Sequence, residues 1–148
     1  MANPIKTEFG TTNQAYVVTA LNSLADGSIA VLPELNIEAL LHLDIKLMLE
    51  ITTGTSVDSD GVIRIFAISS VDEGTTYPDS ANYEHTLIGI MNANADSTEF
   101  RKDILSLVRA YGGKMPPRIK ILVKNETGAA LHASAHEGTY QGVQEQVV

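Results

Sequence analysis

The sequence contains no cysteine and no tryptophan among its 148 residues. Without cysteine the chain can form no disulfide, no thiolate metal site and no cysteine nucleophile, and the redox compartment stays undetermined. Aromatic residues make up only 5% of the chain, so the aromatic platforms on which sugar-binding clefts usually depend are scarce. Packing or association must therefore supply the stability, and a polysaccharide-binding role is weakened.

Positive charge and long apolar runs are also in short supply. The chain carries 18 acidic against 10 basic residues, a net charge of -8, so nucleic acid would be repelled over most of the surface. No window approaches ~18 uninterrupted apolar residues, and the start of the chain lacks the basic and apolar segments of a secretory signal. The sequence predicts synthesis in a cytoplasm, no membrane span and no direct contact with DNA or RNA.

The length and composition fit one globular domain. With 44% hydrophobic and 19% charged residues, a chain of this size can bury roughly 68–70% of the surface that its unfolded form exposes. Residues 1–13 contain Pro4 and Gly10 and show no period of 2 or 3.6 residues, which predicts an N-terminal arm. Residues 14–148 are predicted to form the domain.

The segment 37–51 has the clearest pattern, because apolar and polar residues alternate through its middle. A helix would scatter its apolar residues around the axis, so the alternation predicts one long strand with a polar outer face. The residues expected on the buried face are Leu41, Leu43, Ile45, Leu47, Leu49 and Ile51.

Other β-rich segments are separated by clusters of turn residues. They are residues 15–21, 28–31, 62–69, 86–91, 118–123 and 139–147, and a tight turn over 125–128 leads into 129–135. Residues 101–111 fit a helix or a strand, and that choice stays open. About eight short strands with at most one short helix predict an all-β, jelly-roll β-sandwich with an N-terminal arm.

Two groups of residues invite a metal interpretation. The loop 58–61 (DSDG) begins like a calcium loop, but no glutamate follows six residues after Gly61, so a solvated hairpin loop is the better interpretation. His132 and His136 would stand roughly 13 Å apart on a strand, too far to share one ion. We interpret both histidines as polar surface positions and predict no metal and no cofactor.

The motifs of catalysis are missing from the sequence as well. There is no Gly-x-Ser-x-Gly elbow, and residues 112–114 (GGK) lack the remaining features of a phosphate-binding loop. Residues 125–127 (NET) match a glycosylation acceptor of the kind that occurs by chance. The chain is therefore predicted not to be an enzyme; a small hydrolase would lose turnover on replacement of His132 or His136 by alanine, and we expect no turnover.

Several turns together resemble a family of small bacteriophage virion proteins, the jelly-roll decoration or cement proteins of capsids. The resemblance is carried by residues 21–27 (LNSLADG), 51–55 (ITTGT), 69–77 (SSVDEGTTY), 87–89 (LIG), 112–116 (GGKMP), 123–131 (VKNETGAAL) and 140–143 (YQGV). They span about residues 20 to 145, and each is a turn or a strand edge.

The resemblance implies a protein that binds the outer surface of a capsid and stabilises the shell. Its expected partners are the major capsid protein and further copies of itself, as a homotrimer, and its expected location is the exterior of the virion. Within the arm, Pro4, Ile5 and Phe9 are the residues expected to contact a partner through main-chain pairing and apolar anchors. The alternative function is a receptor- or carbohydrate-binding jelly-roll module of a phage tail or fibre.

Overall fold

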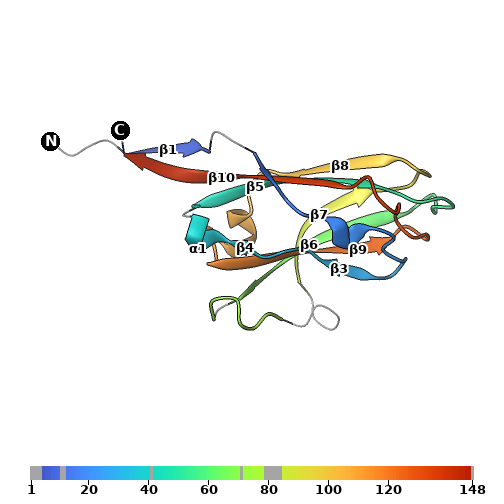
Figure 1. The fold of residues 1–148 in the computed structure, drawn as a ribbon, viewed down its shortest axis with the longest axis horizontal. Helices are drawn as coiled ribbons and strands as arrows, with labels where there is room; N and C mark the ends of the chain where they lie inside the picture. Colours follow the sequence, from blue (N-terminus) through green and yellow to red (C-terminus); the bar gives the residue numbers. More distant parts are fainter. Residues whose placement is uncertain (1–4, 11–12, 41, 71, 79–84, 148) are drawn as a thin grey trace.

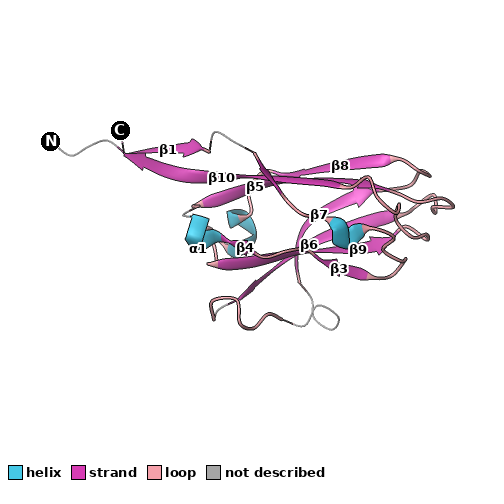
Figure 2. Ribbon diagram, viewed as in Figure 1, coloured by secondary structure: helices cyan, strands magenta, loops and turns pink. Residues whose placement is uncertain are grey.

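The computed structural model of the chain describes residues 5–10, 13–40, 42–70, 72–78 and 85–147. Two antiparallel sheets lie face to face across one apolar interior (Figures 1 and 2). No helix among these residues has the length and apolarity needed to cross a membrane.

Each sheet contains five strands. Sheet A has the order β1-β10-β5-β8, with β2 also paired to β10, and sheet B has the order β3-β9-β6-β7, with β4 also paired to β9. The strands of sheet A are β1 (Ile5–Phe9), β2 (Gln14–Ala15), β5 (Asp44–Thr52), β8 (Glu99–Ile104) and β10 (Glu137–Val147). Those of sheet B are β3 (Ile29–Val31), β4 (Leu35–Asn36), β6 (Val62–Ser70), β7 (Thr86–Asn92) and β9 (Arg118–Glu126).

This topology is the predicted jelly roll. Most connections cross from one sheet to the other, so neighbours within a sheet are distant in sequence. The pairs β1/β2 and β3/β4 each continue along one side of the same partner strand, so eight strand positions result. The helices are short: α1 (Ile37–Leu40) and the two 3-10 turns η1 (Thr19–Leu21) and η2 (Val108–Tyr111). The predicted fold class is confirmed.

The alternation of β5 builds the centre of the interior. Ile45, Leu47, Leu49 and Ile51 are all 0% exposed, and the residues between them face outward with intermediate exposure. Residues of β6 and β9 close the interior from sheet B with the same period of two. Burial of one face of each sheet therefore fixes which side of every central strand faces the core.

The predicted strand 37–51 is wrong at its beginning. Residues 37–40 form α1, and the strand starts only at Asp44, so Leu43 is 46% exposed instead of buried; Leu41 lies outside the described residues. The side chain of Asn36 accepts a hydrogen bond from the N–H of Ala39 at 3.0 Å. Such a cap on residues with good helix propensity favours a helical turn at this point.

Three further segments differ from the sequence prediction. In 15–21 only Ala15 belongs to a strand, and the segment ends in η1, because the chain crosses there from sheet A to sheet B. Residues 101–111 divide into the end of β8 and η2, so neither of the two open alternatives covers the whole segment. Residues 129–135 contain a single bridge, from Leu131 to Thr53.

The segment predicted as an arm contains β1, which pairs with the end of the chain's own β10. Ile5 lies opposite Val147, and Phe9 lies opposite Val143; Pro4 lies outside the described residues. The β5 strand pairs with β10 only as far as Val143, so β1 and the last residues of β10 extend past the rest of the sandwich (Figure 1).

Candidate functional site: the outer face of sheet B

A row of apolar residues crosses the outer face of sheet B. Val31 of β3 pairs with Leu122 of β9, which also pairs with Phe66 of β6. Phe66 pairs in turn with Leu87 of β7, so each of the four strands contributes one residue to the row. The neighbours of Leu122 along β9 belong to the core, which places Leu122 on the opposite face. Val31 is 39% exposed and Leu87 is 48% exposed, whereas Leu122 is 0% exposed, so the row reaches solvent only at its two ends.

Cations surround this apolar row. Arg64 of β6 and Arg118, Lys120 and Lys124 of β9 alternate with core residues and so share the outer face. They are four of the ten basic residues of a chain whose net charge is -8. Two carboxylates pair with them: Glu126 with Arg64 and with Lys124, the latter at 2.7 Å, and Glu34 with Arg118 at 2.9 Å. On β6 and β9 the face therefore carries four cations and the carboxylate of Glu126, and the acidic residues Glu34, Asp72 and Glu73 lie in the connections at its edge.

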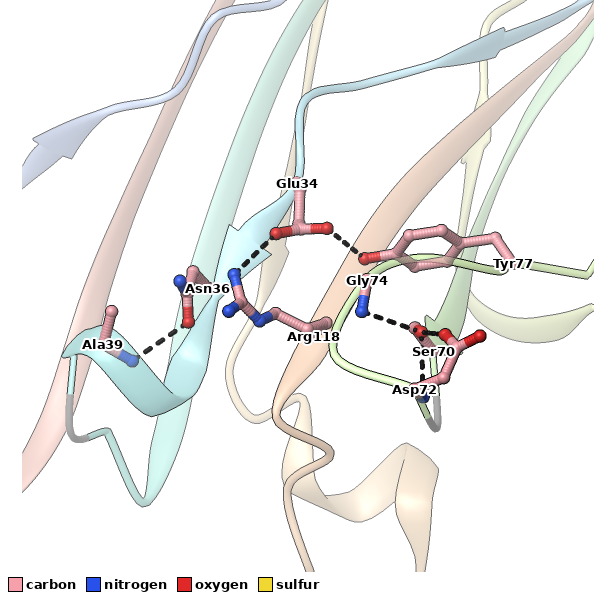
Figure 3. Close-up of polar contacts among 8 residues, drawn as sticks. All are labelled: Glu34, Asn36, Ala39, Ser70, Asp72, Gly74, Tyr77 and Arg118. Atoms are coloured by element: carbon pink, nitrogen blue, oxygen red, sulfur yellow. Dashed lines mark hydrogen bonds and ion pairs between the residues drawn. The ribbon is translucent and has the colours of Figure 1, made fainter.

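The connection from β6 to β7 is fastened to the edge of this face by Glu34 (Figure 3). The hydroxyl of Tyr77 donates to Oε2 of Glu34 at 2.6 Å, and Nη1 of Arg118 donates to Oε1 at 2.9 Å. These bonds hold the pKa of the Glu34 carboxyl below its ordinary value, with the Tyr77 bond the larger cause. Lys120 adds a cation–π contact, its Nζ lying 4.0 Å from the centroid of the Tyr77 ring.

A compact turn shapes the same connection. Ser70 Oγ donates to Asp72 Oδ1 at 2.5 Å and accepts the N–H of Gly74 at 3.0 Å (Figure 3), and Asp72 Oδ1 accepts the N–H of Thr76 at 2.8 Å. The Ser70 and Thr76 bonds lower the pKa of Asp72 to about 2. Gly74 has φ +89°, and a Cβ there would lie 2.6 Å from Oε2 of Glu34, so a side chain at this position would be strained and would displace the Glu34 carboxylate.

The two histidines singled out in the sequence support the main chain of one loop. His136 Nδ1 accepts the N–H of Thr52 at 3.2 Å, and its Nε2 lies 2.9 Å from the carbonyl oxygen of His132. His132 Nδ1 lies 2.7 Å from the carbonyl oxygen of Ser134. Among the residues that the structure describes, no group of three or more His, Asp or Glu side chains is placed to hold a metal ion.

This geometry gives His136 a predicted effect on pH stability. Burial lowers the pKa of His136, and its Nδ1 must stay unprotonated to accept the Thr52 bond. The unfolded chain takes up that proton near pH ~6.5, so the free energy of unfolding should fall as the pH drops below that value. Urea denaturation between neutral and mildly acidic pH measures this slope.

The variant His136→Asn separates this effect from other titrations. An asparagine oxygen can accept the Thr52 bond without titrating, so the variant should lose less stability than the wild type on acidification. The pKa of His42 is also lowered by burial, and its contribution is common to both proteins. Identical pH slopes for the two proteins would contradict the assignment to His136.

The loop 58–61 is a turn that packs against the β9–β10 connection. The N–H of Asp58 donates to the carbonyl oxygen of Thr127 at 2.8 Å, and the N–H of Gly61 donates to that of Asp58 at 3.0 Å. A Cβ at Gly128, where φ is +82°, would lie 2.2 Å from the Asp58 carboxylate. The residues that suggested calcium thus form a tight contact between two loops.

The outer face of sheet B is not among the sites predicted from the sequence. The signal is present in residues 118–126 (RIKILVKNE), where Leu122 stands among charged residues on the non-core side of the alternation. The apolar row itself depends on the register of four strands that are far apart in sequence. Only the structure brings these residues together.

Comparison with known proteins gives no family. No family model matches the chain, and no curated protein matches it. Among solved structures, it is similar to a mutant of Xylanase10C from Cellvibrio japonicus in complex with xylopentaose, with 13% sequence identity and a TM-score of 0.41. The match covers 100% of this chain and 28% of that chain, so this chain spans less than a third of the length of the xylanase.

Proposed function

We propose that the chain is a structural protein of a bacteriophage virion, a decoration protein that binds the outer surface of the capsid and stabilises the shell. The observation that carries the proposal is the outer face of sheet B, where a partly exposed apolar row is framed by cations. The likeness of its turns to those of jelly-roll decoration proteins supports the same role.

The outer face of sheet B has the physical properties of a protein-docking surface. Leu122 at the middle of the row is already 0% exposed, so the apolar surface that a partner would remove from water lies at the ends of the row, at Val31 and Leu87. The surrounding cations would guide the face towards an acidic partner and fix its orientation. The proposed partner is therefore a capsid surface that presents apolar and acidic side chains.

The distribution of acidic residues favours docking by this face. The loops at one end of the sandwich carry Asp26, Asp58, Asp60 and Asp96 and contain no lysine or arginine. Hydrogen bonds hold these loops together, for example from the N–H of Gly128 to Asp26 Oδ1 at 2.9 Å. An acidic end repels its counterpart on another copy, which helps to keep the protein soluble before assembly.

The contacts of Glu34 preorganise one border of the docking surface. Tyr77 and Arg118 hold its carboxylate from two elements, the β6–β7 connection and β9. A border that is ordered before binding loses less conformational entropy when the partner arrives. The surface is thus suited to a shell that is already assembled.

Binding to capsid shells tests the proposal directly. Shells of the phage that encodes the chain, prepared without this protein, should co-sediment with the purified chain and withstand a higher temperature before rupture. Cryo-electron microscopy should then show density for a jelly roll on the outside of the shell. Density confined to the tail, or binding to a glycan array in place of shells, would overturn the proposal.

One substitution tests the docking face itself. Leu87→Asp places a charge at an exposed end of the apolar row, where a bound partner would leave it desolvated. Shell affinity should fall by about tenfold or more, equivalent to at least ~1.4 kcal/mol. Affinity is measured by titration of shells with labelled protein.

The matched control is Val17→Asp. Val17 is 58% exposed and lies on the segment that follows β2, outside the strands that form the apolar row. It introduces the same charge on an exposed apolar residue and should leave shell affinity unchanged within about twofold. Equal losses for the two variants would show that the outer face of sheet B is not the docking face.

A further inference from the structure

Among the residues that the structure describes, no strand pairs with the outer edge of β1 at the projecting end of sheet A. The β1 strand is the terminal strand in the order β1-β10-β5-β8. Of the β10 residues that pair with β1, only Val143 also pairs with β5. A two-stranded ribbon beyond its sheet is only marginally stable in water, and its free edge is a template for another strand (Figure 1).

The hydrogen-bond pattern shows which residues serve that edge. The N–H of Gly10 donates to the carbonyl oxygen of Gly142 at 2.8 Å, in line with the register of β1 on β10. Backbone groups of successive residues alternate in direction along an antiparallel strand. Lys6 and Glu8 therefore direct their backbone groups towards β10, and Ile5, Thr7 and Phe9 direct theirs towards the open edge.

We propose that a second copy of this chain pairs its own β1 antiparallel to this edge, about a two-fold axis at Thr7. Thr7 then lies opposite Thr7 of the second copy, and Ile5 lies opposite Phe9 of the second copy. These are the residues whose backbone groups point outward, so all of them can bond across the interface. The edge is thereby covered by an isologous contact, as a two-fold symmetric dimer requires.

The sequence of β1, IKTEF, is self-complementary in this register. Lys6 lies opposite Glu8 of the second copy, and the symmetry repeats that pair. Lys6 and Glu8 form no backbone hydrogen bonds across this interface, and residues that face each other at such positions approach most closely. The interface therefore joins opposite charges twice along five residues.

Competing registers lack this match. A shift of two residues in one direction places Lys6 opposite Lys6, and a shift in the other direction places Glu8 opposite Glu8. Within the chain, the register on β10 sets these residues opposite the uncharged residues Gln146 and Gln144. A second copy in the centred register is the occupant that the charge pattern selects, independently of any role in a virion.

Charge reversal tests the dimer. Light scattering of the full chain should give twice 15.9 kDa, and Lys6→Glu or Glu8→Lys should each weaken dimerisation by about tenfold or more, because like charges then meet twice. The double variant Lys6→Glu/Glu8→Lys should recover the wild-type dimer. An equimolar mixture of the two single variants should form a heterodimer, because every opposed pair is again of opposite sign.

The control is Glu99→Lys, which changes the net charge as Glu8→Lys does. Glu99 is the first residue of β8, at the other edge of the same sheet, and its reversal should leave the dimer intact. Three outcomes overturn the proposal: a wild-type chain that is monomeric at millimolar concentration, one that forms the homotrimer implied by the resemblance, and a dimer that is insensitive to both single reversals. None of these outcomes decides shell binding, which is measured separately.

Discussion

Replacement of Leu49 by alanine should lower the free energy of unfolding by about 2–5 kcal/mol, because it opens a cavity at the centre of the sandwich. Leu49 is 0% exposed in β5, the strand that lies between β10 and β8 in sheet A. Packing around this site comes from strands on both sides and from sheet B, so little of the lost volume can be refilled. Urea denaturation measures the change.

Met48→Ala is the control for this substitution. Met48 is the preceding residue of β5 and lies on the outer face of sheet A with intermediate exposure, so its loss should cost less than about 1 kcal/mol. In a strand, neighbouring side chains point to opposite faces of the sheet, so these two positions should differ sharply. Similar losses for Leu49→Ala and Met48→Ala would contradict the two-sided strand on which the fold depends.

The central strands could be predicted because each has a strict period of two. In β5 the buried face reads Ile45, Leu47, Leu49 and Ile51, and this pattern is visible in the sequence without any knowledge of the partners of the strand. Burial on one side and solvent on the other also fixes the register, since a shift of one residue would reverse the faces. The jelly-roll class follows from many such segments separated by turns.

The errors lie where a local or tertiary interaction outweighs alternation. Residues 37–40 extend the apolar run, but the Asn36 cap and their helix propensity produce α1. Residues 16–18 do alternate, with Tyr16 and Val18 buried and Val17 exposed, although the chain there is leaving sheet A and has no continuous strand partner. Alternation thus predicts burial better than it predicts hydrogen-bonded pairing.

The candidate surfaces required the structure because they join distant segments. The row from Val31 to Leu87 depends on the pairing of β3, β9, β6 and β7. The edge at β1 depends on a pairing between residues 5–9 and 143–147, for which the sequence has no local signal. What the sequence did provide was the composition of the N-terminal segment, including Ile5 and Phe9.

Replacement of Asn125 by aspartate should destabilise the protein by about 3–5 kcal/mol at neutral pH, because it places an uncompensated charge in the interior. Asn125 is 0% exposed. Its Nδ2 donates to the carbonyl oxygens of Leu24 and Ala129 at 2.9 and 2.7 Å, and its Oδ1 accepts from Oγ1 of Thr127 at 2.8 Å. Aspartate keeps the acceptor but sets a second oxygen against two carbonyl oxygens.

The pH dependence of this variant distinguishes the effect of the buried charge from a general packing defect. Burial raises the pKa of a carboxyl above its value in the unfolded chain, so the folded variant binds the proton more tightly and its loss of stability relative to the wild type should shrink as the pH falls. A protonated carboxyl can again donate to one of the two carbonyl oxygens. Asn94→Asp, at an exposed position of the β7–β8 loop, makes the same chemical change and should cost less than about 0.5 kcal/mol at either pH. If Asn125→Asp were as stable as this control, or if its loss of stability relative to the control were no larger at neutral than at acidic pH, Asn125 would not be the polar centre that joins the β9–β10 turn to the loop at Leu24.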